Sequence, residues 1–153
     1  MNTRKTSPYG TWPSPITSTS ITADAVSLSE IRLHSSGIYW IERRPLEKGR
    51  CVLVRHISGT TNDVLPTPFS ARSHVHEYGG GAYCVTDDGL FFINDCDHNI
   101  YFYNYQAPPR IVTHTNNLQF ADLIFDAARR QLICICQDKL NADTEPANTL
   151  NSI

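Results

Sequence analysis

Short apolar runs separated by turn-forming residues dominate the chain from Val26 onward. Runs rich in Ile, Val, Tyr and Phe recur between turn signals, such as GIYWIERR (37–44), LFFIND (90–95) and QLICICQ (131–137). Short runs of this kind are typical of an all-β chain, and helical periodicity is nearly absent. Only the stretch from Ala23 to Glu30 has a pattern compatible with a helical turn. The sequence therefore predicts an all-β fold.

The runs group into three units, and a short turn connects two runs inside each unit. When the units are aligned on their second strands, Ile38, Leu90 and Leu132 fall in register, 52 and 42 residues apart. Repeats of roughly 40 to 50 residues with four strands each are typical of propeller blades. A sandwich or barrel with regularly spaced strands would give a similar pattern and remains the alternative. The turns that define the units are Ser36-Gly37, Asp88-Gly89 and Ala128-Arg129-Arg130.

This organisation predicts a partial β-propeller of about three blades of antiparallel strands. We expect residues 1–25 to form an extended arm, because their prolines cannot supply strand hydrogen bonds throughout. Residues 26–153 then form an incomplete propeller with blades at about 26–66, 74–114 and 119–153. A closed propeller needs about 4 to 8 blades, so we expect a chain truncated before closure.

The composition of the chain limits the classes of binding partner and the cellular compartment that we expect. The 153 residues have 41% hydrophobic content and a formal charge of −2, without a run of either sign. Neither nucleic acid nor a membrane surface is therefore an expected partner. The N-terminus lacks the apolar stretch of a signal peptide, and no segment approaches the length of a membrane helix. We expect a cytoplasmic protein.

The cysteines are predicted to be reduced thiols rather than metal ligands or disulfides. They are five in number, and all except Cys96 lie in apolar runs, where a thiol behaves as a small hydrophobe. Cys134 and Cys136 form a C-x-C pair, but no second pair completes a zinc site.

Four segments resemble the N-terminal propeller of bacterial acylaminoacyl-peptidase and dipeptidyl-peptidase-like members of the prolyl oligopeptidase family. They are YGTWPSPIT (9–17), IYWIERRP (38–45), HEYGGGAY (76–83) and FADLIFDAARRQLICICQD (120–138). The resemblance spans nearly the whole chain. Its most specific parts are Trp12-x-Ser14-Pro15-Ile16 and the run of Arg72, His76, Glu77, Tyr78, Gly79, Gly80 and Gly81.

The resemblance implies a seven- or eight-bladed propeller that covers an α/β-hydrolase domain, whose Ser, Asp and His cleave short peptides. The sequence contains no Gly-x-Ser-x-Gly elbow, so we expect no catalytic residues and no activity from the chain alone. Its implied role is to gate substrate size and position peptides, with a peptide and an α/β-hydrolase domain as partners and without a cofactor. The alternative is a stand-alone binding or self-assembly module that forms homo-oligomers through open sheet edges. Direct hydrolysis by another site lacks a visible nucleophile and base.

The run HEYGGGAY is the main candidate site. Three consecutive glycines indicate positive φ or close approach of another segment, as in a tight bend entering a strand at Ala82. If the loop instead faces the propeller tunnel or the hydrolase domain, its side chains would contact substrate. Glu77 would then meet a peptide amine and Arg72 a carboxylate. The proposed substrate-binding residues are Arg72, His76, Glu77 and Tyr78, and the structural glycines are Gly79, Gly80 and Gly81.

Two further motifs suggest metal ligands without completing a site. His74 and His76 would share one face of a strand, but no third ligand is near. Asp95-x-Asp97-x-Asn99 begins like a calcium loop, yet Ile100 stands where glycine is needed and Gln106 where glutamate belongs. We interpret it as a polar hairpin turn and expect no metal.

Aromatic and charged residues elsewhere are interpreted as structural. Aromatic side chains in strands mostly pack in the core, so a stacking surface is not expected. Asp122, Asp126 and Arg129 are expected to fix the hairpin of the third unit through hydrogen bonds to the backbone. The aromatic residues concerned are Trp12, Tyr39, Trp40, Phe91, Phe92, Tyr101 and Tyr103.

Overall fold

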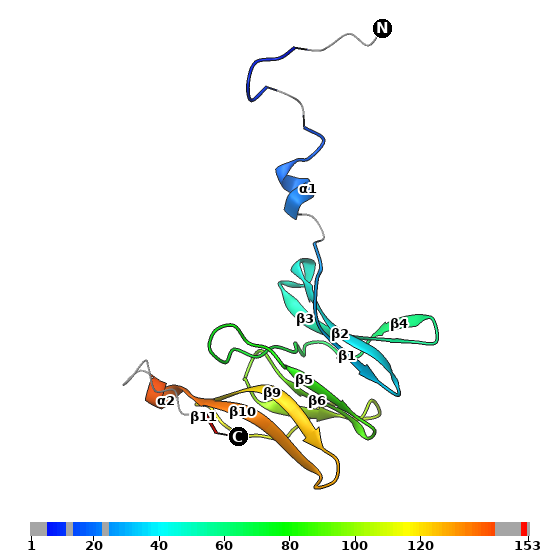
Figure 1. Cartoon of the computed structure of the whole chain (residues 1–153), viewed down its shortest axis with the longest axis vertical. Helices are drawn as coiled ribbons and strands as arrows, with labels where there is room; N and C mark the ends of the chain where they lie inside the picture. The colour runs from blue at the N-terminus through cyan, green and yellow to red at the C-terminus, as the bar shows by residue number, and fades with distance from the viewer. Residues whose placement is uncertain (1–5, 12–13, 23–24, 143–150, 153) are drawn as a thin grey trace.

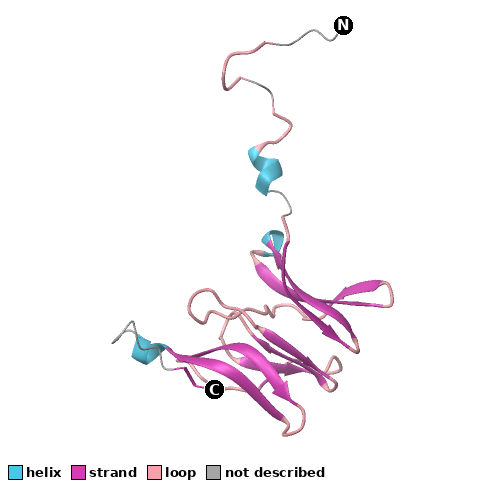
Figure 2. Ribbon diagram, viewed as in Figure 1, coloured by secondary structure: helices cyan, strands magenta, loops and turns pink. Residues whose placement is uncertain are grey.

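Three antiparallel sheets stacked in chain order make up the body of the protein (Figure 1). The computed structural model describes residues 6–11, 14–22, 25–142 and 151–152. Helices are confined to short segments, as Figure 2 shows. The predicted all-β class and the partial propeller are confirmed.

The first sheet has the order β1-β2-β3-β4 and the second the order β5-β6-β7-β8, whereas the third has the order β11-β10-β9. The first consists of β1 (Ser27–His34), β2 (Gly37–Arg44), β3 (Arg50–Ile57) and β4 (Thr60–Asp63), with the 3-10 turn η1 (Pro45–Glu47) after β2. The second consists of β5 (Tyr83–Thr86), β6 (Gly89–Ile93), β7 (Ile100–Tyr103) and β8 (Arg110–Ile111). The third consists of β9 (Leu118–Asp126), β10 (Gln131–Asp138) and β11 (Asn151–Ser152), with α2 (Lys139–Ala142) after β10.

The three turns predicted from the sequence connect β1 to β2, β5 to β6 and β9 to β10. In the last of these, Asp126 Oδ1 accepts hydrogen bonds from the N–H groups of Ala128 and Arg129, at 3.0 and 3.1 Å. Its Oδ2 accepts a third from the Arg129 guanidinium at 2.8 Å. The expectation was wrong for Asp122, which lies inside β9 with a φ of 51° and takes no part in this turn.

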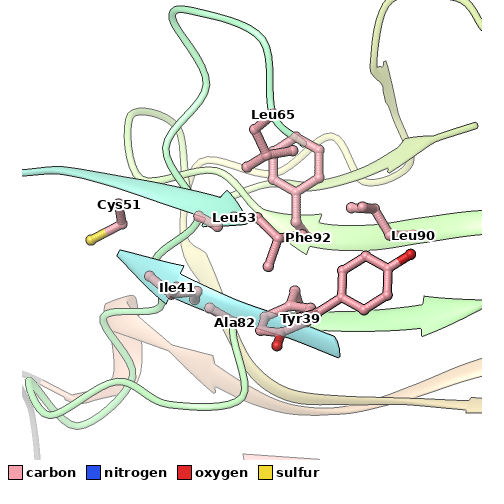
Figure 3. Close-up of a cluster of buried hydrophobic side chains, with 10 residues drawn as sticks. Tyr39, Ile41, Cys51, Leu53, Leu65, Ala82, Leu90 and Phe92 are labelled. Carbon is pink, nitrogen blue, oxygen red and sulfur yellow. The ribbon is translucent and has the colours of Figure 1, made fainter. Parts of the chain in front are cut away.

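Alternation along the strands places one apolar core between each pair of neighbouring sheets. Tyr39 and Ile41 of β2 lie against Leu90 and Phe92 of β6, as Figure 3 shows. The aromatic residues predicted for the core are buried or packed against it, except Trp40 and Trp12. Trp40 is half-buried outside both cores and its Nε1 donates to Glu42 at 3.1 Å, whereas Trp12 lies outside the described residues. The second core, between the second and third sheets, consists of Cys84, Ile93, Ile100, Phe120 and Leu123.

The N-terminal arm contains the helix α1 (Ser18–Thr22), which lies apart from the sheets in Figure 1. Thr17 and Ser20 cap it reciprocally, because each side-chain oxygen accepts the other residue's N–H, at 3.0 and 2.8 Å. The expected helical turn between Ala23 and Glu30 is absent from the described part of this stretch, since β1 already begins at Ser27; Ala23 and Asp24 lie outside the described residues. Pairing with β2 decides the conformation of this segment over its weak helical pattern.

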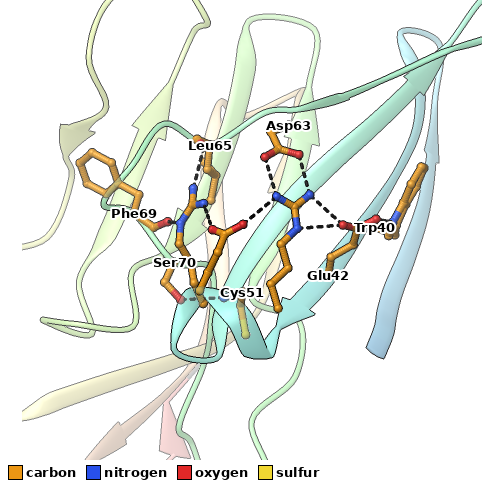
Figure 4. Close-up of polar contacts among 10 residues, drawn as sticks. Trp40, Glu42, Cys51, Asp63, Leu65, Phe69 and Ser70 are labelled. Carbon is orange, nitrogen blue, oxygen red and sulfur yellow. Dashed lines mark hydrogen bonds and ion pairs between the residues drawn. The ribbon is translucent and has the colours of Figure 1, made fainter. Parts of the chain in front are cut away.

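A network of charged side chains ties together the edge of the first sheet (Figure 4). Arg44 of β2 binds both oxygens of Asp63 on β4, at 2.6 and 2.7 Å, and also contacts Glu42 and Glu47. Arg50 binds Glu47 at 2.6 Å and donates to two carbonyl oxygens of the segment after β4. Hydrogen bonds from Arg44 hold the pKa of Asp63 below its usual range. This network is structural.

The five cysteines form no disulfide within the described part of the chain. Cys51 and Cys84 are buried, and burial raises the pKa of both thiols. Cys96 is exposed. Across the described residues, no helix has the length and apolar character required to cross a bilayer.

Candidate functional site

The segment from Arg72 to Ala82 leads into β5 and contains the predicted site. Its backbone is unusual because five of its residues have positive φ, a conformation that L-residues rarely adopt. Residues 75–78 form a turn, and the glycine run then enters the strand. The five values are 52° for His76, 65° for Glu77, 69° for Gly79, 123° for Gly80 and 55° for Gly81.

The glycines allow this loop to lie directly against neighbouring backbone. A Cβ on Gly79 would come within 2.3 Å of the Ser73 carbonyl oxygen, and one on Gly81 within 2.3 Å of the Asp122 Cα. Gly81 also accepts the N–H of Leu123 at 3.1 Å, which joins the loop to β9. Positions 79 and 81 therefore require glycine for both φ and space.

Further hydrogen bonds fix the base of the loop to the third sheet. Ser73 Oγ is buried and donates to the Phe120 carbonyl at 2.6 Å. The N–H of His76 donates to Gln137 Oε1 on β10 at 2.8 Å, and Val75 is buried between these two contacts. The loop is thus a fixed platform.

The side chains at the tip of this platform face solvent. His76, Glu77 and Tyr78 are all exposed, and Tyr78 retains 96% of its accessible surface. Arg72 is half-buried at the start of the loop, where its backbone N–H donates to the Ile93 carbonyl oxygen. Its side chain forms no ion pair with the three tip residues. The three tip residues are therefore exposed together, whereas Arg72 is half-buried. Their contact with a substrate stays a prediction.

His74 does not form the histidine pair considered from the sequence. The expected strand is a turn, and the His74 ring lies instead against the ring of His98, with 4.9 Å between centroids. Its Nε2 contacts Asp95 Oδ1 at 2.5 Å. Burial lowers the pKa of His98, and the positive charge of Lys139 lowers it further. No group of three or more metal-ligating side chains occurs among the residues that the structure describes.

The segment that begins like a calcium loop is a polar turn between β6 and β7. Asp97 Oδ1 accepts hydrogen bonds from the Asn99 N–H at 3.2 Å and from Asn94 Nδ2 at 3.1 Å. Its Oδ2 accepts the Tyr101 hydroxyl proton at 2.6 Å. The prediction of a polar hairpin turn is confirmed, because the motif connects β6 to β7 and Asp97 accepts local hydrogen bonds.

The first strands of the three sheets meet at one side of the stack, which the sequence did not reveal. Glu30 Oε2 of β1 accepts the N–H of Ala82 at 2.8 Å, and the Tyr83 hydroxyl of β5 donates to the Glu30 carbonyl at 2.5 Å. Burial raises the pKa of Glu30. Glu30, Gly81 and Asp122 all have positive φ and follow one another at 51 and 41 residues. These two spacings nearly match the predicted blade spacings of 52 and 42 residues. The repeat was therefore the signal in the sequence that could have located the contact between the first strands.

Solved structures of peptidases are similar to this chain. No family model matches the sequence, and no curated protein matches it. The structure of a puromycin-hydrolysing peptidase from Mycobacterium tuberculosis superposes with a TM-score of 0.79 and 30% sequence identity, over 88% of this chain and 22% of that chain. The crystal structure of a puromycin hydrolase gives a TM-score of 0.74 and 27% identity over the same shares.

The fold of this chain is similar to that of one segment of a puromycin-hydrolysing peptidase. This similarity confirms the resemblance to prolyl oligopeptidase-family propellers that the sequence motifs indicated. The chain spans about a fifth, 22%, of the length of the peptidases it matches.

Proposed function

We propose that this chain is the non-catalytic propeller part of a serine peptidase similar to the puromycin hydrolases. In this role it limits access to an α/β-hydrolase domain and positions short peptides over it. The supporting observation is the structural match at a TM-score of 0.79 with 30% identity across 88% of the chain. The sequence has no Gly-x-Ser-x-Gly elbow, so the proposal assigns catalysis to the hydrolase domain.

The loop tip supplies the groups for peptide positioning in this proposal. Glu77 offers a carboxylate to a peptide α-ammonium group, and His76 and Tyr78 flank it with further polar groups. Anchoring through Ser73 and Gly81 holds the tip in place before a ligand arrives. A fixed platform reduces the ordering cost of binding and favours orientation of a small substrate.

Nuclear magnetic resonance titration of the full chain with tri-alanine tests this role. We expect saturable shifts at the amide signals of residues 76–78, and weaker shifts with N-acetylated tri-alanine, which lacks the ammonium group. Glu77→Gln should remove the difference between the two peptides. Asp87→Asn is the matched control, because Asp87 is an exposed carboxylate on the β5–β6 turn. Equal responses of the wild-type chain to both peptides would contradict the role of Glu77.

A second candidate function is self-assembly, and an exposed apolar face of the first sheet favours it. Leu28, Ile31 and Leu33 of β1 are 68%, 73% and 79% exposed, on the strand that forms the open edge of the sheet. Leu28 and Ile31, with Ile38 and Trp40, border a hollow of about 470 Å³. Apolar patches of this kind mark protein interfaces. A second copy of the chain would cover this face.

Size-exclusion chromatography with light scattering distinguishes the two candidates. Self-assembly predicts a discrete oligomer that Ile31→Lys converts to a monomer, because Ile31 is exposed and borders the hollow. A wild-type monomer across the accessible concentration range would contradict self-assembly and would leave the peptidase role as the supported function.

A further inference from the structure

Arg32 of β1 is a half-buried cation without a hydrogen-bonding partner for its Nε. That Nε is inaccessible to solvent and donates to no acceptor, and the described residues offer the guanidinium neither a hydrogen bond nor an ion pair. Its guanidinium lies over the Tyr83 ring, 5.4 Å from the centroid. Burial of a charged group without an acceptor is costly, so the unpaired guanidinium indicates a place for an acceptor. Because the Nε is inaccessible, the terminal nitrogens are the donors available to that acceptor.

A cavity of about 330 Å³ opens beside Arg32 at the junction of the three first strands. Arg32 is the one charged residue among those that line it, and the other side chains are apolar or a thiol. An adjoining hollow of about 380 Å³ shares Arg32 and reaches the third sheet. The cavity therefore combines apolar walls with one cationic donor. Its remaining lining residues are Leu33, Cys84, Val85, Leu123, Ile124 and Phe125.

Two carboxylates lie in the same region, but neither neutralises Arg32 through an ion pair. Glu30 Oε2 accepts the N–H of Ala82, and burial shifts this carboxyl toward its neutral form by raising its pKa. Asp122 is exposed and borders the adjoining hollow, not the cavity itself. Neither of these two side chains therefore supplies a hydrogen-bond acceptor to the Arg32 guanidinium.

We propose that Arg32 binds the carboxylate of a small organic acid whose branched apolar group occupies the cavity. The planar guanidinium matches a carboxylate with two parallel hydrogen bonds, and Val85, Leu123 and Ile124 provide an apolar surface for the rest of the ligand. A volume of 330 Å³ corresponds to roughly ten water molecules in the liquid, which suits a short branched chain. This site lies beyond the proposed function, because neither gating nor binding of a peptide amine requires it.

The probe is 4-methylpentanoate, and its neutral control is 4-methylpentanamide. Titration of the isotope-labelled full chain should give saturable amide shifts at Cys84, Val85 and Leu123. We expect the carboxylate to bind at least about tenfold more tightly than the amide, as expected for the loss of one charge-assisted pair. Comparable shifts with both compounds, or no saturable shift with either, would overturn the proposal.

Arg32→Gln should reduce carboxylate affinity to the level of the amide. Arg110→Gln is the control, because Arg110 also lies over an aromatic ring, that of Phe102, at 5.0 Å, but does not line the cavity. Arg32→Lys keeps the charge and is used if Arg32→Gln loses a dispersed spectrum; it should show intermediate affinity. Unchanged carboxylate affinity in a folded Arg32 variant would also overturn the proposal.

Discussion

Gly81 lies directly against Asp122, so that a Cβ on Gly81 would come within 2.3 Å of the Asp122 Cα. Both residues have positive φ, and the next N–H, that of Leu123, donates to the Gly81 carbonyl. This contact joins the candidate loop to the first strand of the third sheet. The position of the exposed tip thus depends on a backbone contact between two sheets.

Gly81→Ala is expected to destabilise the fold strongly, because it adds a steric clash to an unfavourable φ. We expect a loss of about 3 kcal/mol or more in the free energy of unfolding, measured by urea denaturation. Gly59→Ala is the control, since Gly59 has a φ of 80° with no atom within 4 Å of an added Cβ. Equal losses in the two variants would show that φ alone matters and that the Asp122 contact does not.

Ser73→Ala tests the anchor between the loop and β9. The substitution leaves the Phe120 carbonyl without its buried donor, so we expect a loss of about 1 to 3 kcal/mol in the free energy of unfolding. Hydrogen exchange should also become faster at the amides of residues 75–79. Ser58→Ala, at an exposed position in the β3–β4 turn, should have little effect. An unchanged exchange rate would show that the other contacts suffice to fix the loop.

His98 should make the stability of the fold depend on pH. Its pKa in the folded protein lies below the ordinary value of 6.5, because burial, Lys139 and His74 disfavour the charged ring. The folded state therefore binds this proton less readily than the unfolded state. Its stabilising contribution is complete above about pH 6.5 and is lost as pH falls through the folded pKa. Asp95 and Asp97 oppose this shift without reversing it.

His98→Asn should remove that part of the pH dependence between pH 7 and pH 5, measured as the urea midpoint. Asparagine is chosen because it tolerates the φ of 57° at this position. His114→Asn, at an exposed position, is the control and should retain the wild-type profile. Identical profiles for the wild type and His98→Asn would contradict the assignment.

Arg44→Met tests the charged network of the first sheet. Removal of Arg44 leaves Glu42, Glu47 and Asp63 close together without their shared cation. Since part of the network is exposed, we expect a loss of about 1 kcal/mol at pH 7. The pKa of Asp63 is lowered from 3.8 in the folded protein, so its contribution is present above that value and is lost as pH falls below it.

The difference between the wild type and Arg44→Met should therefore shrink as pH falls below about 4, because protonation removes the carboxylate charges. Arg43→Met, at a neighbouring exposed position of β2, is the control. A difference that stays constant from pH 7 to pH 3 would show that Arg44 contributes through packing of its alkyl chain.

The strands and hairpins could be predicted because their signals are local. Alternation at Tyr39 and Ile41 gives the buried face directly, and the spacing of Ile38, Leu90 and Leu132 gives the repeat. The helix α1 could not be placed, because it depends on a side-chain cap formed by Thr17 and Ser20 rather than on apolar periodicity.

The details of the candidate site depend on contacts between sheets, which a single sequence does not encode locally. His74 faces Asp95 across 21 residues, and Glu30 meets Ala82 across 52 residues. Likewise, the sequence alone could not show that Asp122 contacts Gly81 and does not stabilise the nearby hairpin. The glycine run itself was visible, because three successive residues without a side chain imply a special backbone.

The proposal that this chain serves as the propeller part of a puromycin-hydrolase-like peptidase is tested most directly by a chimera. The full chain replaces the matching 22% of the Mycobacterium tuberculosis peptidase, and hydrolysis of puromycin is measured alongside a circular dichroism check of folding. We predict a folded chimera that hydrolyses puromycin, with Glu77→Gln raising KM more than it lowers kcat. A folded chimera that does not hydrolyse puromycin would contradict the account.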